Sequence, residues 1–245
     1  MTTSLTTSRE ISSGLARDRL AVALDVPDSH QALELVDRLG DSCSWLKVGI
    51  ELYYAAGNQL IEALRTRGYR IFLDLKLHDI PNTVAGAVRS VSQTGAELLT
   101  VHASGGPAML EAAAKAADVP GAPRLLAVTV LTSMDAHELN AAGIPGLPGA
   151  QVIRLATLAK DSGMDGMVCS PEEVAAVREA TGPETILVVP GIRPADYPAD
   201  DQRRIATAAE TIARGATLLV VGRPITRAAD PAAAARAIVN EIASV

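Results

Sequence analysis

Short runs of apolar residues alternate along the chain with longer segments in which apolar residues recur every three or four positions. Runs of the first kind predict buried β-strands, and segments of the second kind predict amphipathic helices that cover them. Because strands that alternate with helices pair in parallel through right-handed crossovers, this order predicts an α/β protein whose sheet closes into a (β/α)8 TIM barrel. The eight predicted strands span residues 20–25, 44–49, 69–76, 97–102, 124–131, 165–170, 185–191 and 217–223.

An open, doubly wound sheet is the alternative that the same alternation allows. It is disfavoured because the first strand-helix turn, "LDVPDSHQ", lacks the glycine fingerprint of a dinucleotide-binding turn. No segment is rich enough in Gly, Pro or Ser to act as a linker between two domains. The chain is therefore predicted to form a single barrel domain, residues 19–245, after a flexible N-terminal leader, residues 1–18.

Local signals predict where several helices begin and end. The clearest start is Ser170-Pro171-Glu172-Glu173, with Ser170 as N-cap, Pro171 as the first helical residue and Glu173 completing the cap. The segment 140–150 is predicted to be an extended loop after a short helix, "MDAHELN". Helices are expected to stop where glycine enters the left-handed region cheaply, at Gly40, Gly68, Gly95, Gly163, Gly182 and Gly215.

Charged residues interrupt three consecutive apolar strands. In "YRIFLDLKL" the odd-numbered positions are apolar and suit the face packed against helices, which leaves Asp74 and Lys76 on the opposite, inner face. The same alternation turns Asp25 and Lys47 inward. These four charges should meet at the C-terminal mouth, where barrels of this kind carry chemistry, although a structural ion-pair network is the alternative. Asp79 follows the third strand and is predicted to lie on the rim loop.

Two short segments that combine glycine with arginine suggest a phosphate site at the same mouth of the barrel. Gly191-Ile192-Arg193 follows the seventh predicted strand, and Gly222-Arg223 follows the eighth. The loops after these two strands often bind phosphate in TIM barrels, because glycine permits close backbone approach and arginine adds charge-assisted hydrogen bonds. Either segment alone would be a weak signal, but the two together predict a phosphate-binding end of the site.

Composition narrows the classes of partner. The net charge of -6 and pI near 5.3 argue against a general nucleic-acid or anionic-membrane surface, and an aromatic content of 2% leaves few rings to stack on bases. The apolar runs are shorter than the roughly 18 residues of a membrane span. The polar leader lacks the apolar core of a secretory signal, so a cytoplasmic protein is expected. Cys43 and Cys169 are predicted to be buried thiols without a disulfide or zinc site.

Other catalytic motifs are missing from the sequence. It contains neither a G-x-S-x-G nucleophile elbow nor a P-loop, which argues against a serine hydrolase and a nucleoside triphosphatase. The four histidines are scattered without metal-ligand spacing, although His102 ends the fourth predicted strand, where a side chain can line the mouth.

Taken with these residues, the chain resembles the bacterial orotidine 5'-phosphate decarboxylase family. The resemblance covers almost everything after residue 18 and rests on specific motifs, which include "ALDVP", "LKVGIELYYAAG", "FLDLKLHDIPNT", "TVHASGG", "VTVLTSMD", "VPGIRP", "DDQRR" and "VVGRPIT". It implies decarboxylation of orotidine 5'-phosphate to UMP in de novo pyrimidine biosynthesis, with no cofactor and no metal. It also implies a homodimer and small-molecule partners only, with neither nucleic acid nor membrane involved.

The resemblance also implies roles for individual residues. Lys76 would be the proton donor, and Asp74 and Asp79 would complete its charge network with Lys47. Asp74 would also lie beside the substrate carboxylate, while Asp79 and Thr83 would enter the active site of the partner subunit. The remaining substrate contacts would be to the ribose hydroxyls from Asp25 and Lys47, to the pyrimidine from Thr132, and to the phosphate from Arg193, Gln202, Gly222 and Arg223. Residues 195–201 would form part of a lid.

Two other functions remain open on the sequence alone. The D-x-K-x-x-D pattern also occurs in barrels similar to Mg2+-dependent sugar-phosphate decarboxylases and hexulose-phosphate synthases, in which carboxylates hold the metal. The motifs "KLHDIPNT" and "LTS" favour the pyrimidine substrate over these. A nucleotide-binding barrel without catalysis is the second alternative, and it is disfavoured because every proposed catalytic residue is present.

Overall fold

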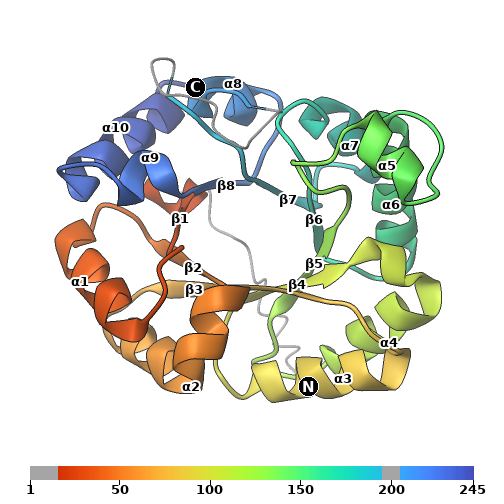
Figure 1. Cartoon of the computed structure of the whole chain (residues 1–245), viewed down its shortest axis with the longest axis horizontal. Coiled ribbons are helices and arrows are strands. Elements are labelled where there is room, and N and C mark those ends of the chain that lie inside the picture. The colour runs from red at the N-terminus through yellow and green to blue at the C-terminus, as the bar shows by residue number, and fades with distance from the viewer. Residues whose placement is uncertain (1–15, 195–204) are drawn as a thin grey trace, which may run out of the picture.

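The structure is a computed structural model that describes residues 16–194 and 205–245. Its eight strands pair in parallel in sequence order, and β1 also pairs with β8, so the sheet closes on itself. The predicted TIM barrel is thereby confirmed (Figure 1). The strands are β1 (Leu20–Ala23), β2 (Trp45–Gly49), β3 (Arg70–Leu77), β4 (Leu98–His102), β5 (Arg124–Val128), β6 (Gly166–Val168), β7 (Ile186–Val189) and β8 (Leu218–Val221).

Helices surround the barrel and cover its outer face (Figure 1). Polar side chains start several of them: Asp28 accepts a hydrogen bond from the Gln31 backbone N–H, and Thr207 forms a capping box with Glu210. The helices are α1 (Ser29–Leu39), α2 (Ile50–Thr66), α3 (Pro81–Ser92), α4 (Pro107–Ala116), α5 (Ala136–Ala141), α6 (Pro148–Asp161), α7 (Val174–Thr181), α8 (Ala208–Ala213), α9 (Arg223–Thr226) and α10 (Pro231–Ala243), with short 3-10 turns η1 (Ala16–Arg19) and η2 (Ala103–Gly105).

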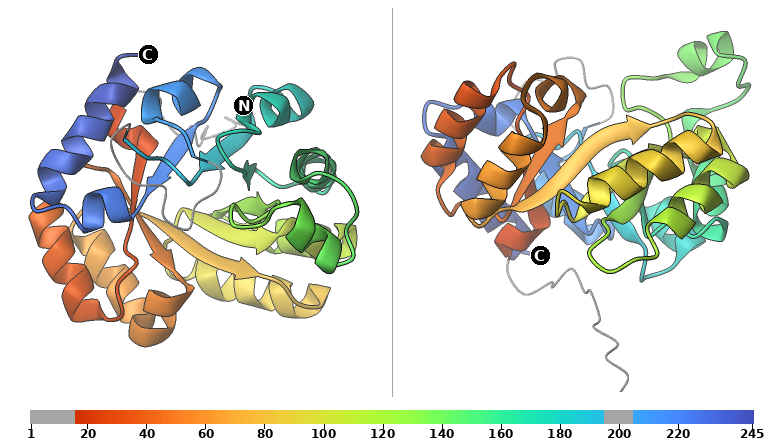
Figure 2. Two further views of the ribbon diagram at one scale, coloured as in Figure 1. Left: turned by 45° about the horizontal axis from the view of Figure 1, so that its top comes forward. Right: turned by 90° about the horizontal axis from the view of Figure 1, so that it is seen from below.

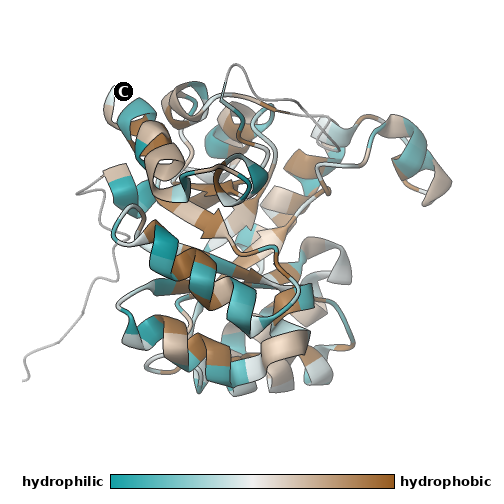
Figure 3. Ribbon diagram, turned by 60° about the vertical axis from the view of Figure 1, so that its left-hand side comes forward, coloured by the Kyte–Doolittle hydropathy of each residue, from teal (hydrophilic) through white to brown (hydrophobic). Residues whose placement is uncertain are grey.

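Strand alternation divides the buried apolar residues into two clusters, as predicted. The larger cluster lies between the sheet and the helices and includes Leu46 and Leu73. The smaller cluster fills the inside of the barrel and includes Trp45, Phe72 and Leu98. Figure 3 shows the strands as largely hydrophobic and the outer helices as alternating between hydrophobic and hydrophilic residues. The inner cluster fills the lower part of the barrel interior, below the carboxyl ends of the strands, where TIM barrels carry their active sites.

Residues of η1 form hydrogen bonds with the N-terminal end of the barrel. The Trp45 indole N–H donates a hydrogen bond to the Asp18 carbonyl at 3.1 Å, and the Arg19 guanidinium donates to the Ala216 carbonyl at 2.7 Å. The guanidinium of Arg70 lies 4.0 Å from the centre of the Trp45 ring. Residues 16–18 belong to the predicted leader, yet here they contact the barrel. Residues 1–15 of that leader lie outside the described residues.

Two predicted helix boundaries are corrected. Helix α7 begins at Val174 rather than Pro171, because Ser170 and Glu173 close a turn of their own in which the Glu173 carboxylate accepts hydrogen bonds from Ser170. The predicted loop 140–150 shrinks to six residues, since α5 runs to Ala141 and α6 starts at Pro148. Helix α5 projects from the barrel body in the right-hand view of Figure 2. The predicted glycine ends are confirmed, with positive φ at Gly40, Gly68, Gly95, Gly163, Gly182 and Gly215.

Candidate active site

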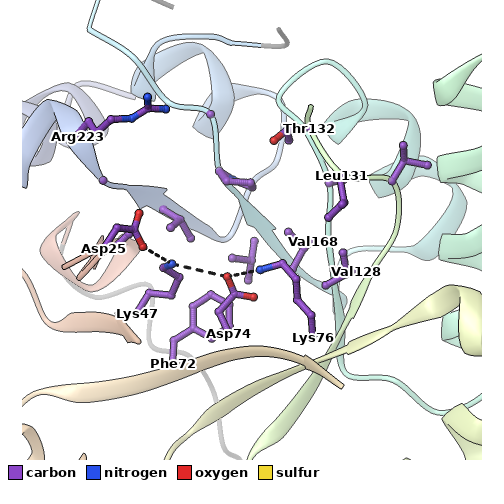
Figure 4. A pocket seen from close by; sticks show the side chains of 18 of the residues that line it. Asp25, Lys47, Phe72, Asp74, Lys76, Val128, Leu131, Thr132, Val168 and Arg223 are labelled. Carbon is purple, nitrogen blue, oxygen red and sulfur yellow. Dashed lines mark hydrogen bonds and ion pairs between the residues drawn. The ribbon is translucent and has the colours of Figure 1, made fainter. Parts of the chain in front are cut away.

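A cavity of about 230 Å³ opens at the C-terminal mouth of the barrel. The cavity is lined by residues at the ends of β1 to β3 and β5 to β8 and in the segments that follow these strands (Figure 4). Eight of the residues predicted from the sequence line it together, namely Asp25, Lys47, Asp74, Lys76, Thr132, Arg193, Gly222 and Arg223.

Four of these side chains form a row of alternating charge, as the strand alternation predicted (Figure 4). The Lys47 ammonium lies 2.8 Å from Asp25 Oδ1 and 3.8 Å from Asp74 Oδ2. The Lys76 ammonium lies 2.7 Å from the same Asp74 Oδ2. Lys47 and Asp74 are the most enclosed members, with side chains 10% and 15% exposed. The pairing allows Lys47 to stay charged in an enclosed place where an isolated charge would be costly, while the Lys76 side chain is 31% exposed.

The backbone of Lys76 is unusual. Lys76 has a φ of 50°, and within residues 16–194 and 205–245 no other non-glycine residue has a positive φ. The left-handed region costs a residue with a side chain about 1–2 kcal/mol. The pairing of β3 with β4 shifts register at the same place, between Leu73 and Leu77. A strained residue inside a bulged strand is a common feature of functional sites.

The side chain that meets this bulge is Thr100 of β4. Its hydroxyl accepts a hydrogen bond from the Lys76 backbone N–H at 2.8 Å and donates one to Asp74 Oδ1 at 3.0 Å. Thr100 is fully buried. It was not among the residues predicted for the site, although strand alternation places it on the same face as Leu98, which points into the barrel.

The wall opposite the charged row is apolar. It is formed by side chains from four strands that follow one another in the sequence, and these side chains were also missed by the sequence analysis. They carry no functional group, so only their inward position in the alternation could have identified them. They are Val128, Val168, Val188 and Val220.

The predicted phosphate end of the site is assembled around two loops. Gly191 and Arg193 follow β7, and Gly222 and Arg223 follow β8. Arg193 is 6% exposed, and its guanidinium donates a hydrogen bond to the Ile192 carbonyl. A Cβ atom on Gly222 would lie 3.2 Å from Asp25 Oδ2, so a larger residue would crowd the carboxylate. Two guanidinium groups and two glycines therefore border one end of the cavity.

Two predicted site residues, Asp79 and Thr83, lie outside the cavity. Asp79 is exposed on the rim, where its carboxylate accepts a hydrogen bond from the Ile80 backbone N–H at 2.6 Å. Thr83 is exposed in the first turn of α3. Within the described part of the chain, neither lines the cavity. Gln202 and the predicted lid segment 195–201 lie outside the described residues.

His102 ends β4 beside the site, but it does not line the cavity. Its ring centre lies 5.4 Å from that of His78. Burial is the main cause that lowers the pKa of His102, and the charges of His78 and Lys76 lower it further. These effects favour the neutral form of the imidazole.

No group of three or more His, Cys, Asp or Glu side chains in residues 16–194 and 205–245 is arranged to hold a metal ion. Over the same residues, the helices are too short or too polar to cross a bilayer.

Comparison with known proteins gives consistent matches over nearly the whole chain. The profile of the "Orotidine 5'-phosphate decarboxylase / HUMPS family" matches residues 18–238. The chain is 51% identical to the orotidine 5'-phosphate decarboxylase of Moorella thermoacetica over 234 residues, which cover 93% of each protein. It is 54% identical to that of Nitrosospira multiformis, with 87% of this chain and 89% of the relative covered.

A solved structure agrees. The crystal structure of orotidine 5'-phosphate decarboxylase from Lactobacillus acidophilus superposes with a TM-score of 0.81 at 41% identity, and the match covers 91% of this chain and 98% of the other.

Proposed function

The chain belongs to the orotidine 5'-phosphate decarboxylase / HUMPS family, and from this membership we propose that it converts orotidine 5'-phosphate to UMP and CO2 in de novo pyrimidine biosynthesis. In this proposal Lys76 stabilises the developing negative charge and donates the proton, and no cofactor takes part. The observation that carries the proposal is the Lys76 ammonium, held 2.7 Å from Asp74 inside a cavity with an apolar opposite wall.

The reaction needs a positive charge at one atom. Breaking the bond from C6 of the pyrimidine to the carboxylate releases CO2 and leaves the electron pair on C6, in an orbital that the ring does not delocalise. A unit positive charge about 4 Å away stabilises that pair by about 4 kcal/mol at an effective dielectric constant near 20. The Lys76 ammonium then gives its proton to C6, and the neutral amine regains a proton from water.

The carboxylates keep Lys76 charged and in place. An isolated ammonium in an enclosed site tends to lose its proton, and a carboxylate close by opposes that loss. Asp74 supplies this charge from within the chain. We propose that Asp79 supplies a second carboxylate to the active site of the partner subunit in a homodimer. Thr83 would enter the same site of the partner subunit. Their exposed positions on the rim, next to Ile80 with 68% of its surface exposed, support this arrangement.

The other half of the substrate is bound at the opposite end of the cavity. Arg193, Arg223 and the two loop glycines would hold the phosphate, with Gln202 from the segment that closes over it. Asp25 and Lys47 would bind the ribose hydroxyls, and Thr132 would contact the pyrimidine. Binding energy from the phosphate and ribose can then be used to orient and enclose the reacting ring.

The arrangement of the carboxylates and ammonium groups in the charged row supports a reaction without a metal ion. Each carboxylate in the row, Asp25 and Asp74, already faces an ammonium group, and Lys47 lies between them where it would repel a cation. A Mg2+-dependent reaction on a sugar phosphate, the alternative suggested by the D-x-K-x-x-D pattern, would need these carboxylates free to coordinate the metal.

One assay tests the proposed function. Protein freed of metals with EDTA is mixed with orotidine 5'-phosphate, and the ultraviolet absorbance change is followed as UMP forms. We expect full turnover that added Mg2+ does not increase. Binding of UMP without any loss of orotidine 5'-phosphate would refute catalysis, and EDTA-sensitive turnover of a sugar phosphate would favour the alternative.

A further inference from the structure

The bulge in β3 brings three residues opposite a single residue of β4. Strand β3 pairs with β4 at Leu73 and Leu99, and next at Leu77 and Val101. Residues 74–76 therefore face Thr100 alone. In a regular pair of strands, the backbone N–H and C=O groups of one strand form hydrogen bonds with those of the other. The extra residues of a bulge lose these backbone hydrogen bonds. The Lys76 N–H, displaced by a φ of 50°, finds the Thr100 hydroxyl as its acceptor.

The direction of both hydrogen bonds of Thr100 follows from the donors present. The Lys76 N–H can only donate, so Thr100 Oγ1 accepts from it, and the hydroxyl proton is left to point at Asp74 Oδ1. Asp74 Oδ1 is thereby occupied, and Asp74 Oδ2 is presented to both ammonium groups, at 2.7 Å from Lys76 and 3.8 Å from Lys47. One buried hydroxyl thus fixes the backbone of the lysine and the orientation of its counter-ion.

We propose that Thr100 is a positioning residue of this active site, which holds the Lys76 ammonium and the Asp74 carboxylate in their reactive geometry. The inference rests on the proposed function, since it concerns the placement of Lys76 for proton transfer to C6. Without the hydroxyl, Lys76 can return to an ordinary extended backbone and Asp74 can rotate. Either movement shifts the ammonium, and a displacement of about 1 Å typically lowers turnover about a hundredfold.

The test compares Thr100→Val with Thr100→Ser. Valine keeps the size and branching of threonine but removes both hydrogen bonds, whereas serine keeps the hydroxyl. We expect Thr100→Val to lower kcat at least about a hundredfold while KM for orotidine 5'-phosphate and the Kd for UMP change less than about threefold. Thr100→Ser should keep kcat within about tenfold of the unmodified protein. A merely structural role would lower stability in both variants without this separation of kcat from KM.

Thr129→Val is the matched control. Thr129 is also buried, at 5% exposed, and its hydroxyl donates to the Val168 carbonyl at 2.8 Å rather than to the charged row. The Thr129→Val variant should be less stable than the unmodified protein, but its kcat should fall much less than that of Thr100→Val. If Thr100→Val is not recovered folded, Thr100→Cys takes its place, because a thiol is only a weak donor and acceptor. We then expect a kcat at least about tenfold below that of Thr100→Ser.

The outcomes separate the two claims. If the unmodified protein fails to decarboxylate orotidine 5'-phosphate, the proposed function and this inference both fall. If it turns the substrate over and Thr100→Val, or its Cys replacement, keeps the kcat of Thr100→Ser, only the positioning role is overturned. An equal loss of kcat in Thr100→Val and Thr129→Val would also overturn it.

Discussion

The two halves of the barrel mouth differ in kind. Strands β1 to β3 and the segment after β1 contribute a charged wall, in which each charged group has a partner within about 3–4 Å and Asp74 is also held by the buried Thr100 of β4, whereas β5 to β8 contribute four valines. The charged wall alone resembles an ordinary buried ion-pair network, and the apolar wall alone resembles core. Placed face to face, they make a site in which fixed charges lie beside an apolar surface, and the more enclosed Asp74 and Lys47 strengthen the charge interactions around Lys76.

This difference explains how one small cavity can serve both the substrate and the product. In the proposed reaction, the charged wall faces the substrate carboxylate and the electron pair that its loss leaves on C6. The apolar wall suits the ring face and the uncharged CO2, because neither needs hydrogen bonds from valine side chains. Each of the following changes alters one wall and leaves the other in place.

The largest effect is expected on removing the ammonium from the charged wall. Lys76→Ala should lower kcat by about 10⁵-fold, because it removes about 4 kcal/mol of charge stabilisation and the proton donor together. The Kd for UMP, measured by calorimetry, should stay within about tenfold. Lys115→Ala, on the exposed surface of α4, is the control and should behave like the unmodified protein. A Lys76→Ala variant with a substantial fraction of normal turnover would exclude Lys76 from the chemistry.

A smaller loss is expected at the phosphate end that joins the two walls. Arg223→Ala should lower kcat/KM for orotidine 5'-phosphate by about 10²- to 10³-fold, since a charge-assisted bidentate contact is lost. The same change should have little effect on turnover of the nucleoside orotidine, because orotidine has no phosphate for Arg223 to contact. Arg236→Ala on α10 removes an exposed arginine and serves as the control. Equal effects on nucleotide and nucleoside would show that Arg223 does not read the phosphate.

A modest effect is expected when the apolar wall is made polar. Val168→Thr keeps the branched shape of the side chain but replaces one methyl group with a hydroxyl, which draws water or a misplaced hydrogen bond toward the reacting ring. We expect kcat to fall about tenfold with little change in KM, in steady-state kinetics. Val239→Thr on α10 is the matched change away from the cavity. Unchanged kcat in Val168→Thr would mean that the dryness of this wall is unimportant.

The smallest effect on catalysis is expected far from both walls. Burial raises the pKa of the Cys43 thiol from 9.0 to about 12. The unfolded chain therefore loses this proton first as the pH rises above 9.0, and the free energy of unfolding should fall by about 1.4 kcal/mol per pH unit up to the folded pKa.

Denaturant titrations of the unmodified protein and of Cys43→Ala at several alkaline pH values measure this slope. The free energy of unfolding of Cys43→Ala should decline less steeply with pH. A part of the decline should remain in the variant, because the pKa of Tyr69 is also raised to about 12, mainly by burial. Turnover at pH 7 should be the same in both proteins. Parallel declines of stability would show that the Cys43 thiol does not remain protonated in the fold.

The alternation of residues along the strands was enough to predict the barrel and the charged row. It worked for Asp25, Lys47 and Asp74 because charged residues stand out in apolar strands. It gave no warning of the bulge at Lys76, because a left-handed lysine has no signature of its own in the sequence and is imposed by tertiary contacts. Thr100 and the valines were overlooked for a different reason, since their residue types are ordinary in strands and only their facing direction matters.

Local signals predicted the glycine ends of helices but not the start of α7. Ser170 and Glu173 do interact, as a capping motif requires, yet they close a turn ahead of α7 rather than its first residues. The positions of Asp79 and Thr83 in the site also remain predictions, because they depend on a second copy of the chain rather than on the contacts of one.

The central claim is that a positive charge at residue 76 drives the reaction, and chemical rescue tests it most directly. Lys76→Cys should be inactive, and alkylation with 2-bromoethylamine, which restores an ammonium group at nearly the same reach, should recover turnover of orotidine 5'-phosphate. Cys43 and Cys169 are at most 4% exposed, but Cys169 also lines the cavity, so bromoethylamine-treated unmodified protein controls for alkylation of either native thiol. Alkylation with iodoacetamide, which adds no charge, should restore nothing. Turnover by untreated Lys76→Cys near the normal rate, or equal recovery with both reagents, would contradict the account.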